Sequence, residues 1–284
     1  MTRSFFPPTV AMSLVMLVSL LICQPSPAQD AALPEKNDNP AQRFYNEFAE
    51  TAQALAFITL TDAQPFTLQQ EPLMKFASEG TTFGSVYVWH DADQRLAMIG
   101  TIGSLPIQNV NVEFVELHLL KPAAIQPVPF TGFPAKTWTP EIEDLTLRPL
   151  SNAPAVAAAE RSRLTQMRNL ARQFAAEMTH DGRTNQLRLL PQPLYRYADS
   201  TQKRDGALFA FVWDTGTDPE LILRIESVPT EGNPQWHYQP IRFTWRQLAL
   251  NHNDVTVWQV EEFRGRDAPK QTTPYITGLT RPLP

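Results

Sequence analysis

The sequence predicts an α+β fold rich in β-strands, with two similar antiparallel β halves joined by one long amphipathic helix. Three observations support this prediction. Short runs of β-branched and aromatic residues, separated by turn residues, dominate residues 58–120 and 183–263. A pattern with helical period occupies part of the stretch between them. Proline accounts for 26 of the 284 residues, which favours turns and edge strands over long helices.

The chain opens with the features of a secretory signal, in residues 1–28. Arg3 precedes an apolar run over residues 11–23, and small residues lead up to Ala28. The run is shorter than the ~20 residues that cross a bilayer as a helix, so we predict cleavage near Ala28 and no transmembrane segment in the mature chain. An uncleaved anchor is the alternative. Cys23 is the only cysteine, so the mature protein would carry no disulfide. We expect export to the periplasm or beyond the cell.

The first half follows a polar, flexible leader over residues 29–41. Residues 42–150 form the predicted N-terminal β-rich half, which starts with one helical face made of Phe44, Phe48, Ala52 and Leu55. From residue 58 onward the pattern is that of strands. Val110, Val112 and Phe114, for example, alternate with polar residues as in a half-buried strand.

The linking helix is predicted over residues 151–182. Apolar side chains recur there at spacings of three and four and give a narrow seam that could cover a sheet. The seam consists of Leu164, Met167, Ala171, Phe174 and Met178. Gly182 lies just beyond the expected end of the helix.

The second half, residues 183–263, repeats landmarks of the first and is followed by a Pro-rich tail over residues 264–284, which we expect to be irregular. Gly84 and Trp89 precede one acidic turn, and Gly206 and Trp213 precede another. The same order of landmarks on both sides of the helix predicts an internal repeat.

The candidate site residues lie mainly at these two turns. Trp89, His90 and Asp91 form one cluster, and Trp213 and Asp214 stand at the matching corner without a histidine. We interpret the cluster chiefly as a hairpin corner, because a large ring buries much area and Asp side chains support turns. Together with His118, these residues are the candidates for a binding site.

No catalytic residue, metal site or cofactor is predicted. None of the five histidines pairs with another at helical ligand spacing, and the acidic turns do not follow an EF-hand pattern. Glu113 and Glu116 would point to opposite faces of one strand, which makes them a poor catalytic pair. The formal net charge is −5, and the sequence shows no concentration of positive charge of the kind that nucleic-acid binding requires.

Four stretches carry a resemblance to known proteins, and they are RLTQMRNLARQF, LLPQPLYRY, DGALFAFVWDTGTDPELILRIE and VWQV. They resemble a family of uncharacterised secreted proteins of planctomycete bacteria, and the similarity extends over about residues 73–263. The family's His-Glu-Phe-His-type strand is matched here by Glu113, Phe114 and His118, with Asn111 or Val112 in place of the first histidine. The resemblance implies export and a shared fold, and no activity.

Together these features favour an exported soluble protein that is not an enzyme, a binding or interaction module of the periplasm or cell envelope. An envelope protein or a glycan is the expected partner. Two alternatives stay open. One is a secreted hydrolase whose site is assembled from distant residues, and the other is a structural subunit of an envelope assembly.

Overall fold

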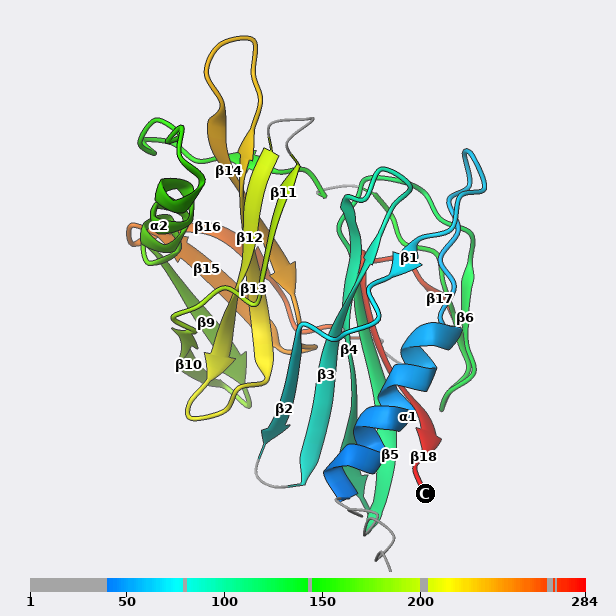
Figure 1. Cartoon of the computed structure of the whole chain (residues 1–284). Coiled ribbons are helices and arrows are strands. Elements are labelled where there is room, and N and C mark those ends of the chain that lie inside the picture. Colours follow the sequence, from blue (N-terminus) through cyan, green and yellow to red (C-terminus); the bar gives the residue numbers. More distant parts are fainter. Residues whose placement is uncertain (1–39, 79–80, 143–144, 200–203, 265–267, 269) are drawn as a thin grey trace, which may run out of the picture. The chain divides into compact units, whose positions relative to one another are not determined.

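The computed structural model describes residues 40–78, 81–142, 145–199, 204–264, 268 and 270–284 (Figure 1). The predicted signal over residues 1–28 and nearly all of the predicted leader lie outside the described residues. Within them, no helix is long and apolar enough to cross a membrane.

The first sheet has six strands in the order β1-β3-β4-β5-β18, with β2 also paired to β3, and all pairings are antiparallel. Its strands are β1 (Thr67–Leu68), β2 (Met74–Ser78), β3 (Thr82–His90), β4 (Leu96–Ile107), β5 (Val110–Leu119) and β18 (Tyr275–Pro282). The end of the chain was expected to be irregular, yet β18 pairs with β5. Its residues complete the first sheet, although they are far from β5 in sequence.

The second sheet has nine strands in the order β16-β15-β9-β10-β12-β13-β14-β8, with β11 also paired to β12. Its strands are β8 (Arg148–Pro149), β9 (Phe174–His180), β10 (Arg183–Leu189), β11 (Tyr195–Asp199), β12 (Arg204–Trp213), β13 (Pro219–Val228), β14 (Gln235–Arg242), β15 (Gln247–His252) and β16 (Val255–Val260). A small third sheet contains β6 (Val128–Phe130), β7 (Lys136–Trp138) and β17 (Lys270–Gln271). The β-rich, antiparallel character predicted from the sequence is thus confirmed.

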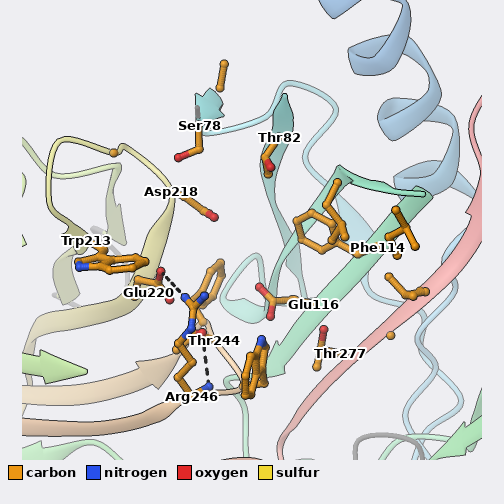
Figure 2. A pocket seen from close by; sticks show the side chains of 18 of the residues that line it. Ser78, Thr82, Phe114, Glu116, Trp213, Asp218, Glu220, Thr244, Arg246 and Thr277 are labelled. Atoms are coloured by element: carbon orange, nitrogen blue, oxygen red, sulfur yellow. Dashed lines mark hydrogen bonds and ion pairs between the residues drawn. The ribbon is translucent and has the colours of Figure 1, made fainter. Parts of the chain in front are cut away.

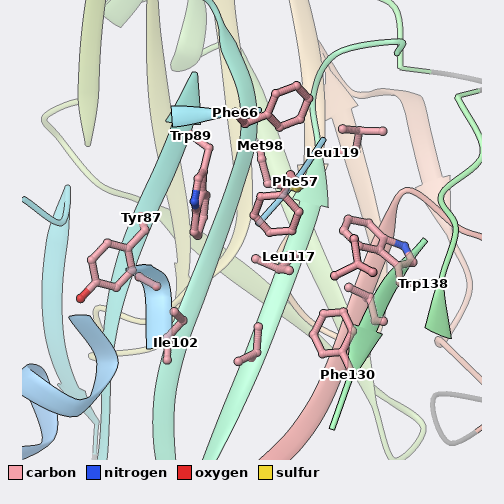
Figure 3. Close-up of a cluster of buried hydrophobic side chains, with 14 of the residues drawn as sticks. Phe57, Phe66, Tyr87, Trp89, Met98, Ile102, Leu117, Leu119, Phe130 and Trp138 are labelled. Atoms are coloured by element: carbon pink, nitrogen blue, oxygen red, sulfur yellow. The ribbon is translucent and has the colours of Figure 1, made fainter. Parts of the chain in front are cut away.

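Both faces of the first sheet are buried, which explains the nearly continuous apolar run in β3. Tyr87 and Trp89 point into a core that includes Phe48 of α1 (Pro40–Ala54), as part of the cluster drawn in Figure 3. Val86 and Val88 point the other way. The helical face predicted for the start of this half therefore covers one side of the sheet.

The two large sheets pack on each other through a second apolar cluster. Val88 and Ile99 of the first sheet share it with Leu208, Ile222 and Ile241 of the second. The opposite face of β12 is also buried, against the cluster that includes Met167 and Leu170 of α2 (Glu160–Ala171). Each large sheet thus lies between its partner sheet and a helix.

The linking helix is much shorter than predicted. Residues 174–180 form β9, where Phe174, Ala176 and Met178 are buried in alternation. Residues four apart lie on one side of both a helix and a strand, so the spacing of Phe174 and Met178 fits either structure. Residues 174–180 form a strand because they pair with β10 and β15. Upstream of α2, Arg163 Nη1 donates to the Ala158 carbonyl at 2.6 Å and helps to hold a non-helical segment.

In both large sheets, a glycine on one strand lies opposite an aromatic residue on the neighbouring strand. Gly84 of β3 lies opposite Phe76 of β2, and Gly206 of β12 lies opposite Tyr197 of β11. A Cβ at Gly84 would lie 2.2 Å from the Phe76 ring, and one at Gly206 would lie 2.4 Å from the Tyr197 ring. In each case a ring covers a glycine on the neighbouring strand, which strengthens a position where glycine alone packs poorly.

Candidate functional site: a pocket between the two large sheets

A cavity of about 920 Å³ is lined by residues of both large sheets (Figure 2). The first sheet contributes the end of β2, the start of β3, the end of β4, β5 and β18, and the second contributes the β12–β13 turn, the start of β13 and the segment after β14. The connection between β6 and β7 adds two further residues. We call this cavity the intersheet pocket. Its described lining is Ala77, Ser78, Thr82, Leu105, Ile107, Phe114, Glu116, Phe133, Pro134, Trp213, Asp214, Thr215, Gly216, Asp218, Glu220, Phe243, Thr244, Trp245, Arg246, Thr277, Gly278 and Leu279.

The two glutamates of strand β5, Glu113 and Glu116, point to opposite faces of the sheet, as their odd spacing along the strand predicts. Glu113 is buried on the α1 side, where its carboxylate accepts hydrogen bonds from Thr51 Oγ1 at 2.8 Å and Thr280 Oγ1 at 2.6 Å. Glu116 lines the pocket, where its Oε1 accepts a hydrogen bond from the Tyr275 hydroxyl at 2.5 Å.

The opposite wall carries two more carboxyl groups, Asp218 and Glu220, at the start of β13. Glu220 Oε1 lies 3.2 Å from Nη1 of Arg246 in an ion pair. The Arg246 guanidinium also lies over the rings of Trp213 and Trp245, at 5.4 Å and 5.5 Å from their centroids. This wall therefore combines a carboxylate, a cation and two indole faces.

Burial raises the pKa of all three inward-facing carboxyl groups. The pKa of Glu116 rises to about 7, mainly because burial disfavours the charged form, and the neighbouring Glu220 adds to the shift. The pKa of Asp218 is raised well above its usual range by burial and by the charges of Glu220 and Glu116. Burial also raises the pKa of Glu220, although Arg246 opposes that shift. Glu116 can therefore hold a proton near neutral pH.

The turn between β12 and β13 is built to hold its conformation. Asp214 has a φ of 46°, in the left-handed region that Asp tolerates better than most residues. The backbone N–H of Gly216 donates to the Trp213 carbonyl at 3.0 Å. Arg188 donates to the carbonyl oxygens of Asp214 and Gly216, at 3.1 Å and 2.9 Å. The backbone that carries Trp213 and Asp218 is thus fixed from outside the pocket.

The predicted cluster at the first turn lies outside the described lining of this pocket. Trp89 is buried and meets the Phe57 ring edge-on, with centroids 5.2 Å apart. Asp91 Oδ1 accepts the backbone N–H groups of Asp93 and Arg95, each at 2.9 Å. Its other oxygen accepts a hydrogen bond from Lys121 Nζ at 2.7 Å.

The two histidines among the candidates have partners of their own. His90 Nε2 lies 3.4 Å from the Tyr195 hydroxyl, a contact between the two large sheets. His118 is buried with its Nδ1 2.8 Å from the Leu119 carbonyl, and burial lowers its pKa to about 4. A neutral His118 therefore donates to that carbonyl.

Of the six predicted candidates, the structure brings Trp213 and Asp214 to the pocket. The proposed match between the two tryptophans is not upheld in detail. Trp89 follows Gly84 by five positions, whereas Trp213 follows Gly206 by seven. Trp89 is 1% exposed and Trp213 is 40% exposed. The first ring belongs to a core and the second to the wall of a cavity.

Sequence reasoning missed Glu116, Asp218, Glu220 and Arg246 as members of one site. The available signal was the acidic turn after Trp213, which the sequence analysis compared only with the calcium-binding loop of an EF-hand. Among the residues that the structure describes, no group of three or more His, Cys, Asp or Glu side chains is arranged to hold a metal ion. Comparison with known proteins adds no further assignment, because no protein-family model, curated protein or solved structure matches this chain.

Proposed function

We propose that the protein is an exported binding protein of the periplasm or cell envelope, and that it binds a small molecule in the intersheet pocket. The observation that carries this proposal is the pocket itself. Its volume of about 920 Å³ suits a ligand of drug size. Aromatic faces and a few convergent polar groups line it, which is the usual composition of such sites. The resemblance to secreted planctomycete proteins supports export.

The pocket is also well placed to bind without large rearrangement. Its walls come from paired strands and from a turn that Arg188 holds in place. Trp213, which is 40% exposed, offers a ring face on a rigid support. Rigid aromatic anchors lose little conformational entropy on binding, which favours affinity.

The experiment is a binding screen with a variant that fills the pocket. Purified protein is titrated with neutral glycans, peptidoglycan fragments, amines and carboxylates, while melting temperature and tryptophan fluorescence are recorded. A ligand at 100 times its Kd adds about 2.7 kcal/mol to stability, enough for a clear shift. We expect Thr82→Trp to abolish the shift, because Thr82 lines the pocket.

The matched control is Thr256→Trp, which places the same ring on exposed strand β16. The control should keep the ligand response of the wild type. A response that survives in Thr82→Trp as well as in Thr256→Trp would place the ligand elsewhere and refute the proposal.

A hydrolase is the second candidate, and one observation favours it. Glu116 and Asp218 come from different sheets, line one pocket and both hold protons more tightly than ordinary carboxyl groups. Such a pair could supply a general acid and a general base. Turnover of a bound glycan or peptide that is lost in Glu116→Gln and Asp218→Asn would establish this reading. Binding without turnover would support the first proposal.

A further inference from the structure

Resting on the binding function proposed above, we infer that the ligand of the intersheet pocket is a small organic cation carrying an amine or guanidinium group. The described lining contains four carboxyl groups and one cationic side chain. The carboxyl groups are Glu116, Asp214, Asp218 and Glu220, and the cation is Arg246. The pocket thus offers more negative than positive groups to whatever enters it.

The internal cation is already engaged. Arg246 forms its ion pair with Glu220. Arg242, the nearby guanidinium, donates to the backbone carbonyl oxygens of Thr244 at 2.6 Å and of Arg246 at 2.9 Å. Its charge lowers the pKa of Glu116 only as a minor cause. Neither cation is therefore committed to the carboxyl group on the first sheet.

Glu116 and Asp218 are the groups left to a ligand. Among the described residues, neither forms an ion pair, and Asp218 makes no hydrogen bond. Glu116 accepts a hydrogen bond from the neutral Tyr275 hydroxyl, and the Thr277 hydroxyl and the more weakly acting Arg242 also favour its charged form without forming an ion pair with it. Figure 2 shows both carboxyl groups at the cavity, contributed by different sheets. A cation between the sheets would compensate both charges in a site partly shielded from water.

Arg246 shows that this wall accepts a cation. Its guanidinium lies over Trp213 and Trp245 and pairs with a carboxylate at the same time. A ligand cation would meet the same two kinds of partner, an acidic oxygen and an aromatic face. A cation is attracted to the face of an indole ring, and more strongly where water is excluded.

An organic cation fits better than a metal ion. Among the described residues no three acidic or imidazole groups are arranged to hold one ion. Carboxyl groups spread over the walls of a 920 Å³ cavity instead suit a molecule whose length places charge at separate points. Diamines and guanidinium amines have that form.

Proton linkage gives the inference a distinctive signature. Glu116 faces Tyr275, Arg242 and Glu220. Its pKa is about 7, so it keeps its proton up to about that pH. Asp218 faces Glu116, Glu220 and Arg246, and its pKa is also raised. A bound cation favours the ionised forms, so binding releases protons. Affinity for the cation should therefore rise as pH increases from about 6 to about 8.

The test is calorimetric titration of the purified protein with putrescine, spermidine and agmatine near pH 6 and near pH 8. Diols of the same chain lengths serve as uncharged controls. We expect the amines to bind about tenfold more tightly at the higher pH, with proton release detected by changing the buffer. Glu116→Gln and Asp218→Asn should each weaken binding by about tenfold or more. The exposed substitutions Glu71→Gln and Asp93→Asn remove the same charge elsewhere and should leave binding unchanged.

The outcomes separate this inference from the proposed function. Amine binding that persists in both Glu116→Gln and Asp218→Asn, or that matches binding of the diols, overturns the cation inference. A neutral glycan that binds and is blocked by Thr82→Trp keeps the binding function and also overturns the cation inference. If neither the amines nor any compound of the wider screen binds, both proposals fail.

Discussion

Replacing Glu116 with glutamine should make the stability of the protein less sensitive to pH. The folded protein raises the pKa of this carboxyl group from 4.5 to about 7, chiefly through burial. Because the fold prefers the protonated form, the group supports stability below about pH 4.5. That contribution is lost as pH rises through about 7. Glutamine mimics the neutral form, since its carbonyl can still accept the Tyr275 hydroxyl.

The expected magnitude follows from the size of the shift. One pKa unit corresponds to about 1.36 kcal/mol, so the rise to about 7 corresponds to on the order of 3 kcal/mol. Urea unfolding should show Glu116→Gln close to wild type near pH 4.5 and more stable by about that amount near pH 8. Glu71→Gln, at an exposed position, is the control for loss of charge. An equal effect of Glu116→Gln at both pH values would refute the reasoning.

Three further predictions address the core and the candidate residues. Trp89→Ala should destabilise the protein by about 3–5 kcal/mol in urea unfolding, whereas Trp213→Ala, at a half-exposed wall, should cost well under half as much. A comparable loss for both would contradict the assignment of one ring to a core and the other to a cavity. The imidazole of His118 should stay neutral down to about pH 4, and an NMR titration midpoint above pH 6 would contradict its burial. Gly206→Val should lower the melting temperature strongly because its Cβ would lie 2.4 Å from the Tyr197 ring, and an unchanged value would argue against that cover.

The β-rich character of the protein could be predicted because strand patterns are local. Alternation in β5 and the turn residues between β3 and β4 are visible within a few positions. The buried face of α1 could also be predicted, because Phe44, Phe48 and Ala52 repeat at a helical spacing. All three side chains are buried in the structure. The predicted length of the linking helix was wrong because a local pattern can fit two structures. Phe174 and Met178 satisfy both periods, and only pairing with neighbouring strands selects one.

Local patterns in the sequence were enough to predict that antiparallel strands dominate, that a helix begins the first half, and that Glu113 and Glu116 point to opposite sides of their strand. Which side of β5 faces a cavity, and which residues meet there, depends on the packing of the sheets. Glu116 is about 100 positions from Asp218 in the chain, and Tyr275 reaches it only because β18 pairs with β5. Side-chain direction along a strand is a local property. Convergence of distant strands, and the burial that raises the pKa of their carboxyl groups, depends on how whole sheets pack.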